Sequence, residues 1–248
     1  MRRLNSFAFN PTRARILALV GVVCLALGPV AQSAPPDGQA APWVDGEELR
    51  YEITWPSGLS LGEASFHARA TQSGWSFESN ITASLPTMEI RDEYRSNADP
   101  QLCSFEFEKN IVHGAKKTSE SIDYDQAAHK AIRNTLSGGG ESEFTIPPCT
   151  RDGLTYLYFL RRELGSGSVP PPDDINFGGQ YEVVVSYAQS LEIEISGETV
   201  RADRILVDLT GPASQRSVEM FVAQDAARTP LIIRTTFELG TFSLKLLR

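Results

Sequence analysis

Hydrophobic and polar residues alternate along most of the chain from Trp43 onward, a pattern typical of β-strands with one buried face. The most regular segment places Leu191, Ile193 and Ile195 between glutamates. Turn residues, such as the Pro-Ser-Gly sequence at 56–58, separate the segments. The pattern predicts about twelve strands. They lie within residues 49–55, 64–69, 75–81, 88–97, 105–108, 116–125, 129–136, 181–187, 191–195, 200–210, 217–223, 231–239 and 241–247.

The connections between these strands are short, which requires neighbouring strands to run antiparallel. The alternation places one face of the sheet against a core and the other face in water. We therefore predict an all-β fold in which a curved antiparallel sheet forms an open or half barrel. A β-sandwich of two sheets is the alternative that the pattern leaves open.

One packed α-helix is predicted near residues 151–164. Thr150 or Asp152 can accept hydrogen bonds from its first amides, and Gly165 can end it. Its apolar residues cover more than one face, which predicts that the helix is buried against the concave side of the sheet. These residues are Leu154, Tyr156, Leu157, Tyr158, Phe159, Leu160 and Leu164. Residues 165–179, rich in glycine and proline, are predicted to form a long loop.

The N-terminal segment has the features of a secretory signal peptide. Four arginines precede an apolar run at 16–27, which is too short to span a bilayer. Small residues at 31 and 33 predict cleavage after Ser33, and an uncleaved membrane anchor is the alternative. No later segment is long and apolar enough for a transmembrane helix. The sequence thus predicts a signal peptide (1–33), a disordered lead-in (34–45) and a single β-rich exported domain (46–248).

The charge balance excludes one class of partner. The whole chain has a net charge of -8, and without the first 33 residues 19 basic residues face 31 acidic ones, a net charge of -12. Such an acidic protein repels phosphate backbones and anionic lipid headgroups. We therefore expect no nucleic-acid partner.

Two cysteines, Cys103 and Cys149, remain once the predicted signal peptide with Cys24 is removed. An even number of cysteines in an exported chain favours a disulfide bond, and two buried free thiols are the alternative. Together with only three histidines, and without close Cys-x-x-Cys or His-x-x-x-His spacing, the pair does not predict a zinc site.

Short segments distributed over the mature chain occur in a recognisable order. They are 46–53 (Gly-Glu-Glu-Leu-Arg-Tyr-Glu-Ile), 61–64 (Leu-Gly-Glu-Ala), 91–96 (Arg-Asp-Glu-Tyr-Arg-Ser), 152–161, 229–233 and 239–246. With these segments the chain resembles the bacterial exported family called domain of unknown function 3108 over residues 46–248. The resemblance implies an exported, mainly β protein and supplies no catalytic residues.

The ionisable residues form no recognisable catalytic or metal-binding motif. His67, His113 and His129 lie on separate predicted elements, and no Gly-x-Ser-x-Gly sequence is present. The charged stretch 89–93 is more typical of the solvent face of a strand than of a carboxylate pair. The two aspartates at 173–174 lack a further series of calcium ligands. We therefore expect no enzymatic activity, no cofactor and no metal.

These observations favour a non-enzymatic cell-envelope protein, periplasmic or associated with the outer envelope. The apolar residues of a curved sheet either fill a core or line a cavity for an apolar ligand. For a cavity, we expect Leu157, Phe159 and Leu160 on the helix to form one wall and Trp55 and Phe237 the opposite wall. An envelope-protein partner, a secreted hydrolase without a recognisable motif and a small outer-membrane barrel are the alternatives.

Overall fold

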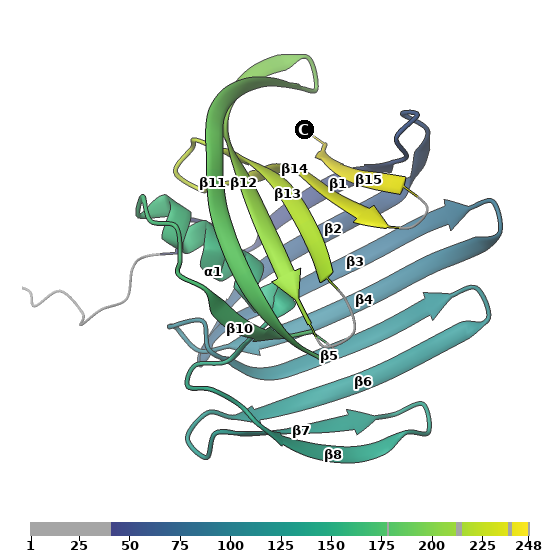
Figure 1. Cartoon of the computed structure of the whole chain (residues 1–248), viewed down its shortest axis with the longest axis vertical. Helices are drawn as coiled ribbons and strands as arrows, with labels where there is room; N and C mark the ends of the chain where they lie inside the picture. The colour runs from purple at the N-terminus through teal and green to yellow at the C-terminus, as the bar shows by residue number, and fades with distance from the viewer. Residues whose placement is uncertain (1–40, 178, 212–214, 238–239, 248) are drawn as a thin grey trace, which may run out of the picture. The chain divides into compact units, whose positions relative to one another are not determined.

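Fifteen β-strands and one α-helix make up the described part of the chain, and the strands form a single sheet (Figure 1). The computed structural model describes residues 41–177, 179–211, 215–237 and 240–247, all within one unit of the chain, Asp37–Arg248. The first strands are β1 (Glu47–Thr54), β2 (Ser60–Thr71), β3 (Gly74–Leu85), β4 (Met88–Ala98), β5 (Ser104–His113), β6 (Lys116–Asp125), β7 (Lys130–Thr135) and β8 (Gly140–Thr145). The others are β9 (Arg151–Asp152), β10 (Asp173–Asn176), β11 (Gln180–Ile195), β12 (Glu198–Thr210), β13 (Gln215–Ala223), β14 (Pro230–Phe237) and β15 (Gly240–Leu246).

Most strands lie antiparallel to the next strand of the chain. Two pairings depart from this rule: β1 also pairs with β15, and the short β9 runs parallel to β10. The strand order runs from β8 through β1 and β15 to β9, so the sheet has two ends and, over the residues described, is not closed. The predicted curved, open antiparallel sheet is confirmed, and the two-sheet sandwich is wrong because all strands belong to one sheet.

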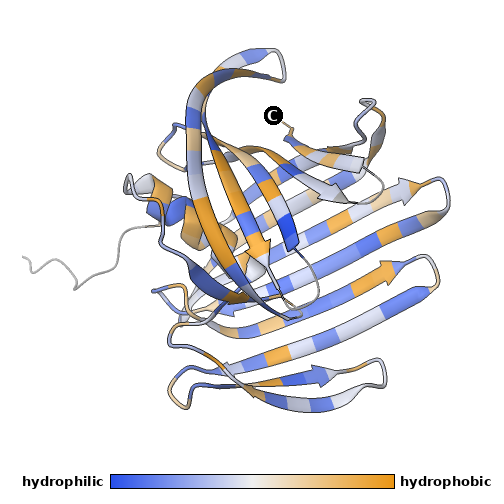
Figure 2. Ribbon diagram, in the orientation of Figure 1, coloured by the Kyte–Doolittle hydropathy of each residue, from blue (hydrophilic) through white to orange (hydrophobic). Residues whose placement is uncertain are grey.

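The curvature of the sheet is visible in its core. One cluster of buried side chains joins Leu61 on β2 and Ala83 on β3 with Ala202 on β12 and Phe221 on β13. These strands are far apart in the sheet order, so their side chains can meet only if the sheet bends strongly. In Figure 2, orange positions are interspersed among blue and white ones along β3–β6, as expected for strands with one buried face.

The helix α1 (Gly153–Gly165) begins at Asp152, which is the N-cap. One carboxylate oxygen of Asp152 accepts hydrogen bonds from the amides of Leu154 (2.8 Å) and Thr155 (3.0 Å). The other oxygen accepts from the hydroxyl of Ser104 on β5 at 2.6 Å and from that of Ser96 on β4. The sequence allowed either Thr150 or Asp152 as the N-cap. The structure assigns Asp152, whose carboxylate is also held by hydroxyl groups of β4 and β5.

The helix packs against two separate parts of the sheet, as predicted for a helix that is apolar on more than one face. Tyr156, Leu160 and Leu164 contact residues of β10–β13, whereas Leu154 and Tyr158 belong to a cluster with residues of β2–β4. The rings of Tyr158 and Phe77 stack with centroids 4.0 Å apart. No helix in the described ranges is long and apolar enough to cross a membrane.

Some element boundaries differ from the prediction. Residues 181–187 and 191–195 belong to one long strand, β11, because the register shifts between Tyr187 and Gln189 and the strand continues past this irregularity. The predicted loop 165–179 contains β10, which pairs with β11. Both differences depend on strand pairing, which no local pattern reveals.

The end of the predicted disordered lead-in is part of the packed domain. Trp43 is only 3% exposed, and its ring makes edge-to-face contacts with Trp75, Phe77 and Tyr158. The carboxylate of Asp45 accepts a hydrogen bond from the amide of Ala70. The prediction of disorder is therefore wrong for 41–45, and residues 34–40 lie outside the described residues.

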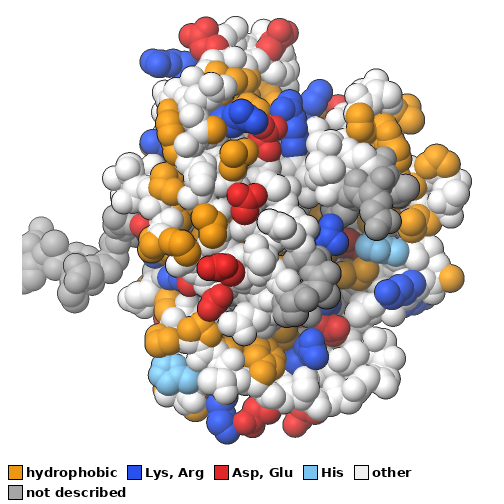
Figure 3. All heavy atoms as spheres, viewed as in Figure 1, with side chains coloured by type: hydrophobic (Ala, Val, Ile, Leu, Met, Phe, Trp, Pro, Cys, Tyr) orange, Lys and Arg blue, Asp and Glu red, His pale blue; other side chains and the backbone are white. Residues whose placement is uncertain are grey.

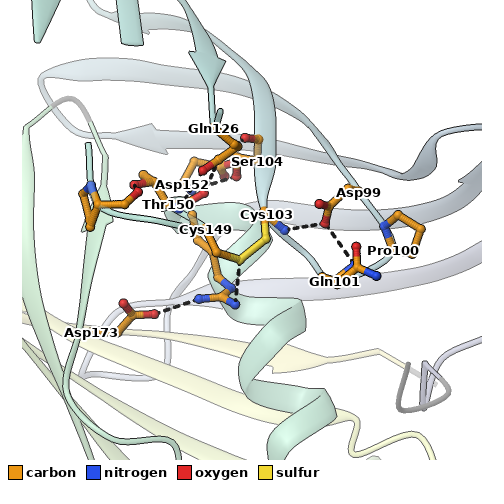
Figure 4. Close-up of a disulfide and its surroundings, with 12 residues drawn as sticks. Asp99, Pro100, Gln101, Cys103, Ser104, Gln126, Cys149, Thr150, Asp152 and Asp173 are labelled. Carbon is orange, nitrogen blue, oxygen red and sulfur yellow. Dashed lines mark hydrogen bonds and ion pairs between the residues drawn. A yellow bond between two sulfur atoms is a disulfide. The ribbon is translucent and has the colours of Figure 1, made fainter. Parts of the chain in front are cut away.

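A disulfide bond joins Cys103, just before β5, to Cys149, just before β9 (Figure 4). This is the first of the two alternatives that the sequence left open. The amide of Cys103 donates to Asp99, and the guanidinium of Arg151 donates to both Cys149 Sγ (3.3 Å) and Asp173 (2.9 Å). The bond therefore ties the start of the helix segment to the first half of the sheet.

Candidate ligand-binding cavity

A cavity of about 330 Å³, partly open to solvent, is lined by seven strands that are consecutive neighbours in the sheet, from β5 through β1 and β15 to β14. Five strands from the first half of the chain, β1–β5, contribute to its wall together with β14 and β15. The side chains that line it are mainly aliphatic: Ile53, Leu61, Ile81, Ala83, Leu85, Met88, Ile90, Asp92, His113, Thr235, Phe242 and Leu244. Its volume is within the range of small-molecule binding sites, about 300–1,000 Å³.

The apolar wall follows directly from strand alternation. On β3, Ile81, Ala83 and Leu85 are every second residue, so they project from the same face. In the register Ala83 lies opposite Ile90 on β4, and Ile53 on β1 lies opposite Leu244 on β15. Opposite residues share a face, which makes the lining continuous across β3–β4 and across β1–β15.

Connections between the lining strands lie close to other lining strands. Pro56 in the β1–β2 turn lies next to the start of β15, since a Cβ atom at Gly240 would lie 3.4 Å from Pro56 Cγ. The β5–β6 turn is tied to β4 by a hydrogen bond from the Gly114 amide to the Glu89 carbonyl (2.8 Å). Leu59, in the β1–β2 turn, is 63% exposed. Figure 3 shows hydrophobic side chains along the right-hand margin, where Figure 1 places the β1–β2 and β3–β4 hairpin tips.

One hydrogen-bonded pair, Asp92 and His113, interrupts the apolar lining. His113 Nε2 lies 2.9 Å from Asp92 Oδ1, and the hydroxyl of Tyr94 donates to the other carboxylate oxygen at 3.5 Å. Burial raises the pKa of Asp92, and the neighbouring His113 partly offsets this. Desolvation and the nearby Asp92 likewise raise the pKa of Tyr94 above its ordinary value. The pair can bind a polar group of a ligand at an otherwise apolar wall.

The sequence-predicted wall residues do not line this cavity. Leu160 is buried in the cluster that joins α1 to β10–β13, and Leu157 and Phe159 pack against that cluster. Trp55 borders the cavity indirectly, because its ring contacts that of Phe242 with centroids 5.0 Å apart. The side chain of Phe237 lies outside the described residues. A ligand-binding role for the three helix residues stays a prediction that the cavity does not support.

Sequence reasoning missed the pairing of Asp92 with His113. The stretch 89–93 is a charged strand, as expected, and Glu89, Arg91 and Glu93 are exposed. Asp92 projects from the opposite face of β4, the face that also carries Ile90. Its place on this apolar face was the signal in the sequence that could have singled it out. Only strand pairing shows that this face meets the end of β5.

Other clusters offer less to a ligand. A hollow of about 560 Å³ over β5–β8 is more open to solvent and has charged side chains in its lining, among them Asp123, Lys130 and Glu143. Asp173, considered above as a calcium ligand, forms an ion pair with Arg151. In the described ranges no group of three or more His, Cys, Asp or Glu side chains is arranged to hold a metal ion.

Comparison with known proteins supports the fold and identifies the family. The crystal structure of a beta-barrel-like protein of domain of unknown function DUF1849 from Brucella abortus has a TM-score of 0.60 at 8% identity, covering 81% of this chain and 95% of that chain. A crystal structure from Parabacteroides distasonis covers 82% of this chain and 94% of its own at 7% identity, with a TM-score of only 0.29, which supports no argument. No curated protein matches. A family model described as "Protein of unknown function (DUF3108)" matches residues 50–247, so the chain belongs to this family, as its sequence resemblance predicted.

Proposed function

We propose that this protein is a non-enzymatic component of the cell envelope that binds an apolar ligand in the cavity lined by β1–β5, β14 and β15. The observation that carries the proposal is the cavity of about 330 Å³ with its mainly aliphatic lining. Each methylene group of a ligand that moves from water into such a site contributes roughly 0.8 kcal/mol. A short hydrocarbon chain is therefore enough for measurable affinity.

The envelope location is supported by the sequence and by the disulfide. The arginine-rich start, the apolar run and the small residues before position 34 are typical of a signal peptide. A disulfide such as Cys103–Cys149 persists in the oxidising compartments that such a peptide leads to. Sequencing the N-terminus of the protein purified from its own host should find Ala34, and an intact Met1 would contradict export with cleavage.

Ligand binding is tested by filling the cavity. Ala83 is buried and lines the cavity, so Ala83→Phe places a ring in its space. Ser84, the next residue of β3, is exposed on the other face, so Ser84→Phe adds the same ring outside the cavity as a matched control. Binding is measured with a fluorescent fatty-acid probe, and folding with thermal unfolding.

We expect Ala83→Phe to weaken probe binding about tenfold, since excluding two methylene groups removes roughly 1.6 kcal/mol of burial. Ser84→Phe should leave probe affinity unchanged. The proposal is contradicted if the parent protein does not bind the probe, or if both variants bind it as the parent does. Native mass spectrometry of the protein from its own host then identifies the natural ligand.

A further inference from the structure

One edge of the cavity carries two basic side chains on neighbouring strands. His113 ends β5 and Lys116 begins β6, and the two residues lie directly opposite each other in the register. Opposite residues of an antiparallel pair project from the same face, with their Cβ atoms about 5 Å apart. Because His113 lines the cavity and its side chain is 41% exposed, Lys116 lies on the same face beside a solvent-exposed edge of the cavity, here called its mouth.

Lys116 has no ion-pair partner within the described residues, although charged groups near it on this face do have partners. Asp92 pairs with His113, and further along the same face of β5 and β6 Lys109 pairs with Glu120 at 2.9 Å. Lys116 is exposed and takes part in neither pair. An unmatched cation at the opening of an apolar cavity favours an anionic group at that position.

We propose that the ligand is a single-chain anionic amphiphile, with its hydrocarbon chain among the aliphatic side chains and its acidic head beside Lys116. This inference rests on the proposed function and names the class of ligand. Apart from Asp92, His113 and Thr235, the lining is apolar, so the charged end of such a molecule has to point to the mouth. There the ammonium of Lys116 donates charge-assisted hydrogen bonds to an acidic oxygen.

Asp92 is held inside the wall by its own partners. Its Oδ1 lies 2.9 Å from His113 Nε2, and its Oδ2 accepts a hydrogen bond from the Tyr94 hydroxyl, so Lys116 is the group left to meet the ligand head. A cationic head beside Lys116 would be repelled, and a neutral hydroxyl head would gain only an ordinary hydrogen bond. The site is therefore expected to rank ligands of equal chain length as acid, then alcohol, then ammonium.

The test compares dodecanoate, dodecanol and dodecylammonium on the whole mature protein, by displacement of the fluorescent probe below the concentrations at which these compounds aggregate. Lys116→Gln removes the cation at the mouth. Lys117→Gln is the matched control, because Lys117 is the next residue of β6, is also exposed and projects from the opposite face. Thermal unfolding shows whether each variant is folded.

We expect dodecanoate to bind about fivefold more tightly than dodecanol, as for one partly exposed ion pair, and Lys116→Gln to abolish this difference. Lys117→Gln should preserve it. Equal binding of the acid and the alcohol by the parent protein, or equal effects of the two lysine variants, would overturn the inference while leaving an apolar ligand site in place. Failure of all three compounds to displace the probe would overturn it too, and absence of probe binding would count against the proposed function itself.

Discussion

Glu47→Ala is expected to destabilise the protein strongly, because it leaves a buried guanidinium without its carboxylate. Arg161 on α1 is 1% exposed, and its two terminal nitrogens donate to the two carboxylate oxygens of Glu47 on β1 at 2.6 and 2.7 Å. Burial lowers the pKa of Arg161, but the bonds to Glu47 outweigh this and raise the pKa above its ordinary value. Arg161 therefore stays charged at every pH at which the protein is folded.

The magnitude follows from the contacts that remain after the substitution. Arg161 would keep its hydrogen bonds to the carbonyls of Ala227 (2.9 Å) and Arg228 (3.3 Å), in the β13–β14 connection, and its contacts with the rings of Trp43 and Tyr158, but none of these groups carries a negative charge. Removing one partner of a buried ion pair typically costs about 3–5 kcal/mol. A typical domain has a free energy of unfolding of about 5–15 kcal/mol, so this is a large share of the total.

Urea unfolding followed by tryptophan fluorescence measures the loss. Glu48→Ala is the matched control, since Glu48 is the next residue of β1 and is exposed, and it should change the free energy of unfolding by less than about 0.5 kcal/mol. The double variant Glu47→Ala/Arg161→Met, which removes both charges, should be less unstable than the sum of the two single variants. If Glu47→Ala costs no more than Glu48→Ala, the buried pair does not hold α1 to β1 and the reasoning is refuted.

Three further predictions concern other parts of the fold. Replacing Cys103 and Cys149 by alanine should lower the free energy of unfolding by about 2–4 kcal/mol, and thiol titration of the denatured, unreduced parent should find no free thiol. Leu160→Ala should cost about 2–5 kcal/mol in urea unfolding without weakening probe binding, because Leu160 is in the core and not in the cavity; weaker probe binding in a folded variant would contradict this. Burial raises the pKa of Asp203, but hydrogen bonds from neighbouring serine, glutamine and arginine side chains outweigh it and hold the pKa below its ordinary value. The stability that Asp203 contributes is therefore complete above its unfolded pKa of roughly 3.9 and is lost as the pH falls through the lower folded value, so Asp203→Asn should flatten the acid-induced loss of stability measured by urea unfolding below about pH 4.

Local sequence patterns are enough to predict the class of structure. Strand alternation along segments such as 191–195, short connections and one helix with apolar residues on most sides were sufficient to predict an open, curved antiparallel sheet with a packed helix. These features are local, because the side-chain period of a strand and the capping of a helix depend on residues only a few positions apart. The pairing of two cysteines in an exported chain was also predictable as one of two alternatives.

The position of the cavity and the meeting of its polar groups depend on the tertiary structure. Asp92 and His113 are 21 residues apart, and Glu47 and Arg161 are 114 residues apart. The first pair depends on the pairing of β4 with β5, and the second depends on the packing of α1 against the sheet. The helix residues predicted as a cavity wall pack in or against the core cluster that joins α1 to β10–β13, because the sheet contacts α1 on two sides. Periodicity shows that a residue faces inward, but the curvature of the whole sheet decides whether it meets another side chain or an empty volume.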